Sequence, residues 1–137
     1  MKRVVAVVGA SGFVGSAVAE HLAVEYEVRR LVAPRLQVQA TSISDLRAAV
    51  DLAAVDAYAE QYLVGVNLVV NAAGLATATA THLPALLGAN AVLPLFLAEA
   101  AHRAQADSYV HVSSAAVQGR GLLTESEDMR PENPYAV

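Results

Sequence analysis

A serine pair and a tyrosine are the side chains of this sequence best suited to catalysis. Ser113 and Ser114 end an apolar, β-branched run, and Tyr135 follows an acidic loop. A hydroxyl and a phenol at neighbouring strand and helix ends suit the reduction of a carbonyl group. The serine hydrogen-bonds the substrate oxygen, the tyrosine exchanges its proton, and the hydride comes from a nicotinamide. These residue types predict carbonyl chemistry that depends on a bound dinucleotide.

A glycine-rich segment near the N-terminus could hold the phosphates of such a dinucleotide. The sequence GASGFVG at residues 9–15 spaces three glycines three apart, directly after the β-branched run at residues 3–8. Glycine permits a tight turn that brings backbone N–H groups and a helix N-terminus against a pyrophosphate. The position between a buried strand and a helix favours this interpretation over an ordinary turn. The predicted cofactor-binding residues of the segment are Gly9, Ser11, Gly12, Phe13, Val14 and Gly15.

The residues after the next predicted strand bear on which dinucleotide binds. An acid about 20 residues after the glycines would hold the adenosine ribose hydroxyls. Ala33 stands at that place instead, and Arg35 follows it. An arginine there suits a 2′-phosphate, so the predicted cofactor is NAD(P) with a preference for NADP. The alternative is that Arg35 is a solvated surface residue.

Small residues follow the predicted strand that ends at Asn71. They read NAAG at residues 71–74. Small side chains let the ribose and nicotinamide of a cofactor pass close to the backbone. We therefore expect Ala72, Ala73 and Gly74 to contact the cofactor.

Four segments in this order together resemble one enzyme group: GASGFVG, NAAG, VSSAAVQG and ENPYAV. The group is the extended short-chain dehydrogenase/reductase superfamily, in its NAD-dependent epimerase/dehydratase branch. The resemblance implies a Rossmann domain followed by a smaller C-terminal substrate domain. It implies that Ser114 and Tyr135 are catalytic and that Asn90, in GANAVLP, steadies the cofactor region. The implied reaction is hydride transfer at a carbonyl or hydroxyl carbon of a nucleotide-linked sugar, by an epimerase, dehydratase or reductase.

The sequence departs from that family at three places. The aspartate that binds the adenine amino group aligns with Ser42, which brings no charge, and we expect Ser42 and the adjoining Ile43 to contact the cofactor. Gln118 replaces a tyrosine near the substrate, which changes the expected substrate shape. The family's lysine, four residues after Tyr135, would lie beyond residue 137. Residues 1–137 are therefore expected to be an NAD(P)-binding domain without that lysine and without the substrate domain, and to be inactive alone.

Composition excludes several other functions. The formal charge is −4, from 13 acids and 9 bases, and aromatic residues make up 5%, so no nucleic-acid partner is expected. Without cysteine there is no disulfide framework. The four histidines share no ligand spacing, so no metal is predicted, and His111 is expected to be a hydrogen-bonded core residue.

The apolar run at residues 4–8 is too short for a signal peptide, and polar residues interrupt residues 61–98, so we expect a cytoplasmic protein without a membrane span.

The elements that must position these residues alternate along the chain. Apolar, β-branched runs predict five strands, at residues 3–8, 27–32, 36–40, 67–71 and 109–113. Helical spacing predicts helices at residues 13–24, 44–62 (with Ser44 as the hydroxyl cap) and 83–103 (with a kink at Pro94), and residues 119–134 are predicted to be loop. Such alternation predicts a Rossmann-like, doubly wound α/β fold with a mostly parallel sheet, whose ligand lies beyond the carboxyl ends of the strands.

Two classes of function fit these observations. The first is an NAD(P)-dependent enzyme that takes a small-molecule substrate and could be a homodimer at full length. The second is a non-catalytic module that senses the NAD(P) state, or an inactive N-terminal fragment. A lysine four residues after Tyr135 in a longer reading frame would favour the enzyme.

Overall fold

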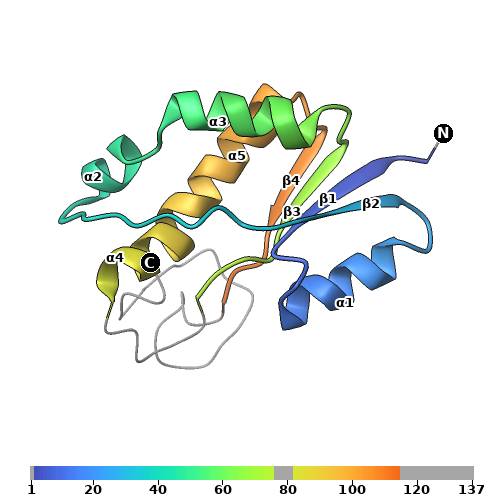
Figure 1. Cartoon of the computed structure of the whole chain (residues 1–137), viewed down its shortest axis with the longest axis horizontal. Helices are drawn as coiled ribbons and strands as arrows, with labels where there is room; N and C mark the ends of the chain where they lie inside the picture. Colours follow the sequence, from blue (N-terminus) through green and yellow to red (C-terminus); the bar gives the residue numbers. More distant parts are fainter. Residues whose placement is uncertain (1, 76–81, 115–137) are drawn as a thin grey trace, which may run out of the picture.

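Strands and helices alternate along the chain in the computed structural model, which describes residues 2–75 and 82–114 (Figure 1). The described strands are β1 (Val4–Val8), β2 (Glu27–Leu31), β3 (Leu68–Asn71) and β4 (Ser108–His111). The α-helices are α1 (Phe13–Leu22), α2 (Ile43–Ala48), α3 (Leu52–Tyr58), α4 (Leu83–Leu87) and α5 (Leu93–Arg103). Two π-helical turns, η1 (Ala59–Leu63) and η2 (Gly88–Val92), adjoin them.

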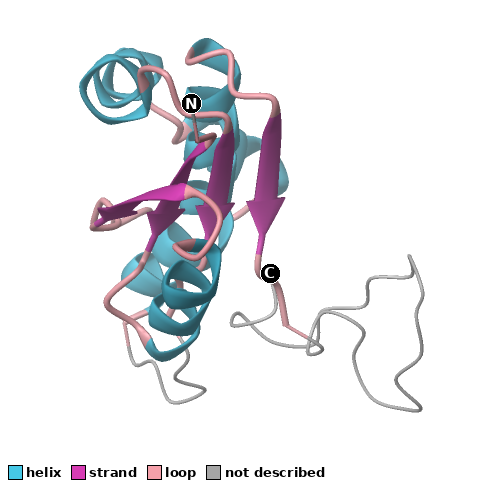
Figure 2. Cartoon of the chain, turned by 90° about the vertical axis from the view of Figure 1, so that its right-hand side faces the viewer, coloured by secondary structure: helices cyan, strands magenta, loops and turns pink. Residues whose placement is uncertain are grey.

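The described strands form one parallel sheet in the order β2-β1-β3-β4. β1 lies between β2 and β3, where Val8 is in register with Leu31 on one side and with Asn71 on the other. Figure 2 shows the strands side by side with helices on both sides of the sheet. The predicted α/β class with a parallel sheet is confirmed. Because all the strands run the same way, their carboxyl ends meet at one edge of the sheet.

Side-chain alternation in β1 contributes to two hydrophobic cores, one on each face of the sheet. Ala6 and Val8 belong to the core that α3 and α5 cover, whereas Val5 and Val7 belong to the core on the α1 side. All four side chains are almost completely buried. A strand buried on both faces requires a continuous apolar run, and the sequence VVAVV supplies one.

The strand predicted at residues 36–40 is wrong, and the described sheet has four strands instead of five. The segment after β2 pairs with the start of α4 instead, where the N–H of Val38 donates to the C=O of Pro84 at 2.9 Å. Gly88 permits this approach, because a Cβ at that position would overlap the carbonyl group of Leu36. The backbone of this segment thus satisfies its hydrogen bonds outside the sheet.

The helix predicted at residues 44–62 is divided in two. The N-cap of α2 is Ser42, not the predicted Ser44. A second cap, Asp51, begins α3, and its carboxylate accepts hydrogen bonds from the N–H groups of Ala53 (3.0 Å) and Ala54 (3.2 Å). The apolar periodicity runs through both helices, which is why it does not reveal the break between them.

α4, η2 and α5 form one helical stretch, Leu83–Arg103. Pro94, where the sequence predicts a kink, stands in the first turn of α5, directly after the π-helical turn η2. Inside a continuous helix a proline leaves one backbone carbonyl without its N–H donor, and here the hydrogen-bond spacing changes at η2, directly before Pro94. By length and composition this stretch could cross a membrane, yet 44% of its most apolar window is buried. Its buried residues in α5 pack in the core: Leu93, Phe96, Leu97, Ala100 and Ala101.

Candidate cofactor-binding site

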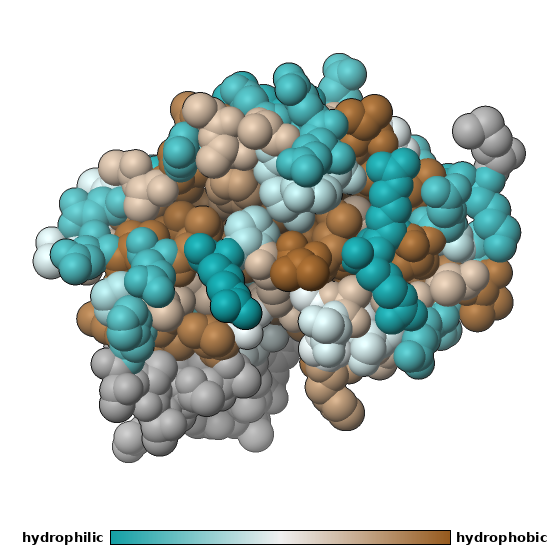
Figure 3. All heavy atoms as spheres, viewed as in Figure 1, coloured by the Kyte–Doolittle hydropathy of each residue, from teal (hydrophilic) through white to brown (hydrophobic). Residues whose placement is uncertain are grey.

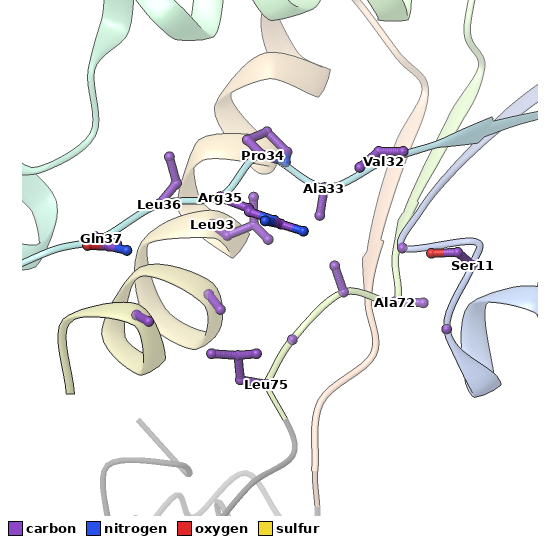
Figure 4. A pocket seen from close by; sticks show the side chains of 16 residues that line it. Ser11, Val32, Ala33, Pro34, Arg35, Leu36, Gln37, Ala72, Leu75 and Leu93 are labelled. Atoms are coloured by element: carbon purple, nitrogen blue, oxygen red, sulfur yellow. The ribbon is translucent and has the colours of Figure 1, made fainter. Parts of the chain in front are cut away.

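A groove of about 420 Å³ opens at the carboxyl ends of β1, β2 and β3 (Figure 4). The glycine turn after β1, the segment after β2, the loop after β3 and one face of the α4–α5 helix line it. The described lining residues are Gly9, Ser11, Gly12, residues 32–37, residues 72–75, Ala85, Ala89 and Leu93. Figure 3 shows that apolar residues reach the surface between hydrophilic ones along the strip that β2 and its following segment cross. Ligands of open parallel sheets bind at this edge.

The first glycine of the turn is required by both conformation and space. Gly9 has φ +81°, a conformation that side-chain-bearing residues rarely adopt. A Cβ at Gly9 would lie 2.8 Å from both the Cα and the N of Ala73. Gly9 therefore lets the turn after β1 pack against the loop after β3, which closes one end of the groove.

The N-terminus of α1 has no side-chain cap. Its N-cap residue is Gly12. A Cβ at Gly12 would meet Gly9 O at 3.3 Å, a tight contact with the turn, and no other described atom within 4 Å. The side chains of Phe13 and Val14 are 93% and 45% exposed. What this turn offers a ligand is therefore its free N–H groups together with the helix dipole, the combination that binds phosphate.

Gly15 has a different role from the other two glycines. It is buried inside α1, and a Cβ there would overlap the carbonyl of Gly9 and approach Ala10. Gly15 thus lets the helix pack tightly against the end of β1. The sequence assigns all three glycines to the cofactor, whereas the structure gives Gly15 a packing role that the spacing alone does not reveal.

Arg35 contributes the charge of the groove. Among the described lining residues it is the one with a charged side chain, and none of them carries a carboxylate. Figure 4 shows its guanidinium group reaching toward the middle of the groove, near Ala33 and Leu93. The ion pairs formed between described residues do not include Arg35. A positive group without an acidic neighbour suits an anionic ligand.

Asn71 holds the loop that forms the groove's floor. Its side chain is completely buried at the end of β3, and its Oδ1 accepts a hydrogen bond from the N–H of Ala73 at 3.0 Å. Its Nδ2 lies 3.5 Å from the hydroxyl of Tyr109 and 3.2 Å from Nδ1 of His111. Tyr109 in turn donates to the carbonyl of Pro94 at 3.0 Å, and burial raises the pKa of its hydroxyl. A buried amide with these partners fixes the backbone that follows it.

His111 is not the core residue that the sequence predicts. It hydrogen-bonds Asn71 but is exposed, because β4 is the outermost strand of the described sheet. Partial desolvation lowers its pKa below the ordinary histidine value. A neutral imidazole can accept the amide's hydrogen bond through Nδ1, so the lowered pKa agrees with the contact. Within the described ranges there is no cluster of three or more side chains that could hold a metal ion.

Asn90 supports the same loop from the helix side. Its Oδ1 accepts from the N–H of Leu75 at 2.8 Å, and its Nδ2 donates to the carbonyl of Leu75 at 3.0 Å. A Cβ on Gly74 would come within 3.1 Å of this Oδ1. Asn90 lies in η2 and acts on the groove through the backbone of residues 74–75.

Ser42 and Ile43 are not among the residues that line this groove. The hydroxyl of Ser42 accepts from the N–H of Asp45 at 3.1 Å, and the carboxylate of Asp45 accepts from the N–H of Ser42 at 2.9 Å. Hydrogen bonds from Thr41, the largest cause, lower the pKa of Asp45. Ile43 is 74% exposed. This reciprocal pair is a capping box that begins α2.

Of the two predicted catalytic residues, the structure describes only Ser114. Ser114 follows β4 and is half-buried. Tyr135, Gln118 and the predicted loop at residues 119–134 lie outside the described residues. Of the predicted cofactor residues, the structure brings Gly9, Ser11, Gly12, Arg35 and residues 72–74 together in the groove, whereas Phe13, Val14 and Gly15 are not among its lining residues.

Several lining residues are absent from the sequence prediction. They comprise Val32, Pro34, Leu36 and Gln37 in the segment after β2, Leu75 after β3, and Ala85, Ala89 and Leu93 on the helix. The last three are spaced four residues apart, so they share one helix face. That spacing was visible in the sequence, but an Ala–Ala–Leu stripe also fits ordinary core packing.

The family profile that matches this chain is that of the NAD-dependent epimerase/dehydratase family, and it covers residues 5–137. The match includes the glycine turn, the groove and both predicted catalytic positions. The chain belongs to this family. The groove fits the dinucleotide in the family's name, because the start of α1 has no side-chain cap and a Cβ at Gly12 would crowd the turn beside it.

Solved structures of sugar-converting enzymes are similar to this epimerase/dehydratase-family chain. Uronate dehydrogenase from Agrobacterium tumefaciens is 25% identical with a TM-score of 0.68, and the match covers 99% of this chain and 51% of that one. UDP-N-acetylglucosamine 4-epimerase from Methanobrevibacter ruminantium, in complex with UDP-N-acetylmuramic acid, is 27% identical with a TM-score of 0.69, covering 98% and 46%. A mutant of the uronate dehydrogenase complexed with NAD shares the fold, at 24% identity and a TM-score of 0.68, covering 99% and 51%.

The chain spans about half the length of the solved structures that it matches. The comparison with curated proteins gave no match.

Proposed function

We propose that this chain is the dinucleotide-binding half of an NAD(P)-dependent enzyme that transfers a hydride at a carbonyl or hydroxyl carbon of a nucleotide-linked sugar. The observation that carries the proposal is the groove in which the uncapped N-terminus of α1, the glycine turn and Arg35 meet. Membership of the epimerase/dehydratase family supports the reaction class. The UDP-sugar epimerase among the similar structures supports the substrate class.

Each part of the site has a separate task in this proposal. The N–H groups at the start of α1 bind the pyrophosphate. Asn71 and Asn90 hold the loop at residues 72–75 against which the ribose and nicotinamide pass. Ser114 hydrogen-bonds the substrate oxygen, and Tyr135 exchanges a proton with it. When bound, the nicotinamide supplies or accepts the hydride.

The proposed cofactor preference is for NADP over NAD. Arg35 provides a guanidinium group for the 2′-phosphate, and Ala33 provides no carboxylate to hold the free ribose hydroxyls. A carboxylate in this position would also repel the 2′-phosphate. The described groove lining, with one positive charge and no acid, thus favours the cofactor that carries the additional phosphate.

Titration of the protein with NADPH and NADH tests this proposal. The wild type should bind NADPH about tenfold or more tightly than NADH, since a charge-assisted hydrogen bond contributes about 1.5–3 kcal/mol. Arg35→Ala should remove most of that preference by weakening NADPH binding alone. Arg30→Ala is the matched control, because Arg30 is exposed on β2 and does not line the groove.

Two results of the titration would count against the proposal. A preference for NADH in the wild type, or an unchanged ratio in Arg35→Ala, would reject the role of Arg35. Binding of neither cofactor would reject the dinucleotide site itself.

The proposal also covers the location, partners and oligomeric state of the enzyme. We place it in the cytoplasm, as a soluble protein without nucleic-acid or membrane partners and with a homodimer as its full-length form. The formal charge of −4 supports the absence of a nucleic-acid partner. The Leu83–Arg103 helix buries one face in the hydrophobic core, which supports the absence of a membrane span.

A further inference from the structure

Three polar side chains are arranged in order along the length of the groove. Ser11, Arg35 and Gln37 are the polar side chains among the described lining residues. In Figure 4, Ser11 lies at the glycine turn, Arg35 reaches into the middle, and Gln37 lies at the opposite end, beyond Leu36. Pyrophosphate, ribose and base follow in the same order along the adenosine half of a dinucleotide. Gln37 thus occupies the end of the groove that the base would reach.

That end of the groove has apolar walls. Leu36 adjoins Gln37, and Ala85 and Ala89 of the helix are further apolar residues of the lining. Alanine side chains are short, so a flat ring can approach the helix closely. A mostly apolar lining with one amide side chain suits a planar base that makes a few directed hydrogen bonds.

The backbone on both sides of Gln37 is fixed. The carbonyl of Leu36 lies so close to Gly88 that a Cβ there would overlap it. Val38 is 9% exposed, and its N–H donates to the carbonyl of Pro84 at 2.9 Å. The amide of Gln37 therefore starts from a defined position next to the groove, although its side chain is exposed.

Ser42, which aligns with the family's adenine-binding aspartate, is used elsewhere. Its hydroxyl accepts the N–H of Asp45, and its own N–H donates to the carboxylate of that residue. Moving the hydroxyl to a ligand would remove one cap of α2. Gln37, in contrast, makes no side-chain hydrogen bond that would have to be broken among the contacts of the described residues.

We propose that Gln37 reads the amino edge of the adenine ring and determines specificity for the base. This inference rests on the proposed dinucleotide site. Adenine presents the N6 amino group as a donor beside N7 as an acceptor. A glutamine amide matches this pair, because its Oε1 accepts from N6 and its Nε2 donates to N7. Hypoxanthine carries a carbonyl oxygen in place of the amino group, so it cannot donate to the Oε1.

The test compares binding of NAD(P)H with binding of its analogue in which hypoxanthine replaces adenine. The wild type should bind the adenine form about tenfold more tightly, the discrimination typical of one well-formed bidentate pair. Gln37→Leu should weaken the adenine form and bring the ratio of the two affinities close to one. Two matched controls, Gln39→Leu and Ser42→Ala, should retain the wild-type ratio, because neither residue lines the groove. Thermal unfolding of each variant checks that the fold is intact.

The outcomes separate this inference from the proposed function. If the wild type binds both forms but Gln37→Leu leaves their ratio unchanged, or if Ser42→Ala abolishes the preference, the role of Gln37 is rejected and the dinucleotide site stands. If the wild type binds neither form, the proposed site fails, and the inference fails with it.

Discussion

At the scale of single residues, three glycines of one motif meet three different constraints. Gly9 is needed for its left-handed φ and for its approach to Ala73. Gly15 is needed because α1 packs against the carbonyl of Gly9. Gly12 has an ordinary φ of −78°, and a Cβ there would meet the carbonyl of Gly9 alone, at 3.3 Å. In the proposed function, a side chain at Gly12 would also obstruct a phosphate that approaches the start of α1.

Substitutions at two of these glycines should separate binding from stability. Gly12→Val should abolish dinucleotide binding while the unfolding transition stays within about 1 kcal/mol of the wild type, because the added side chain fills the cradle and not the core. Gly15→Ala should destabilise the fold by about 1–3 kcal/mol, the cost of overpacking a dense contact. Urea unfolding and NADPH titration measure the two effects. Unchanged NADPH affinity in Gly12→Val would show that the turn does not bind the pyrophosphate.

At the scale of elements, capping side chains decide where the helices between β2 and β3 begin. Ser42 and Asp45 form a capping box on α2, and Asp51 caps α3. The two helices differ in what they bury: α2 has no buried residue, whereas Val55 and Tyr58 of α3 are buried. Burial raises the pKa of Tyr58 to about 12, and its ring packs against Phe96 of α5. The cap of α3 therefore acts on an element that belongs to the core.

The two caps should thus have unequal effects on stability. Asp51→Ala should lower the free energy of unfolding by about 1 kcal/mol, the usual effect of losing an N-cap. Ser42→Ala should lower it less, because α2 can fray without exposing core residues. Chemical denaturation of both variants measures the difference. A larger loss in Ser42→Ala than in Asp51→Ala would mean that α2 is more tightly coupled to the fold than its burial indicates.

At the scale of the whole molecule, the described sheet leaves apolar surface at β4. Val110 is in register with the buried Val70, on the face of the sheet that α1 partly covers, yet Val110 is 48% exposed. Val112, two residues on, is 38% exposed. The similar solved structures are about twice as long as this chain. An apolar edge strand of this kind is a surface that proteins cover with another segment or with a partner.

Catalysis should accordingly depend on more than residues 1–137. These residues alone should bind NADPH but give no detectable turnover with a panel of nucleotide sugars, whereas the longest protein that the reading frame encodes should be active. The measurement is the absorbance of the reduced nicotinamide over time. Turnover by residues 1–137 that disappears in Tyr135→Phe would show that this half contains a complete catalytic site.

Local signals in the sequence were enough for the fold class and much of the groove. The run VVAVV and the glycine spacing predict a buried strand, a phosphate-binding turn and a helix, because each depends on side-chain volume and backbone freedom over a few residues. The small residues after Asn71 predict in the same way that the backbone at residues 72–74 lines the groove. Arg35 is found because its distance from the glycines along the chain places it at the end of the next strand.

Features that depend on contacts between distant residues were decided only by the tertiary structure. Residues 36–40 look like a strand, but their backbone is satisfied by Pro84 and packed against Gly88, both about fifty residues away. His111 looks like a core residue, yet its exposure is set by the position of β4 at the margin of the described sheet. Gln37 carries no local signal at all. Its place at one end of the groove follows from the pairing of its segment with α4, because hydrogen bonds and close packing between distant segments are satisfied only once the chain has folded.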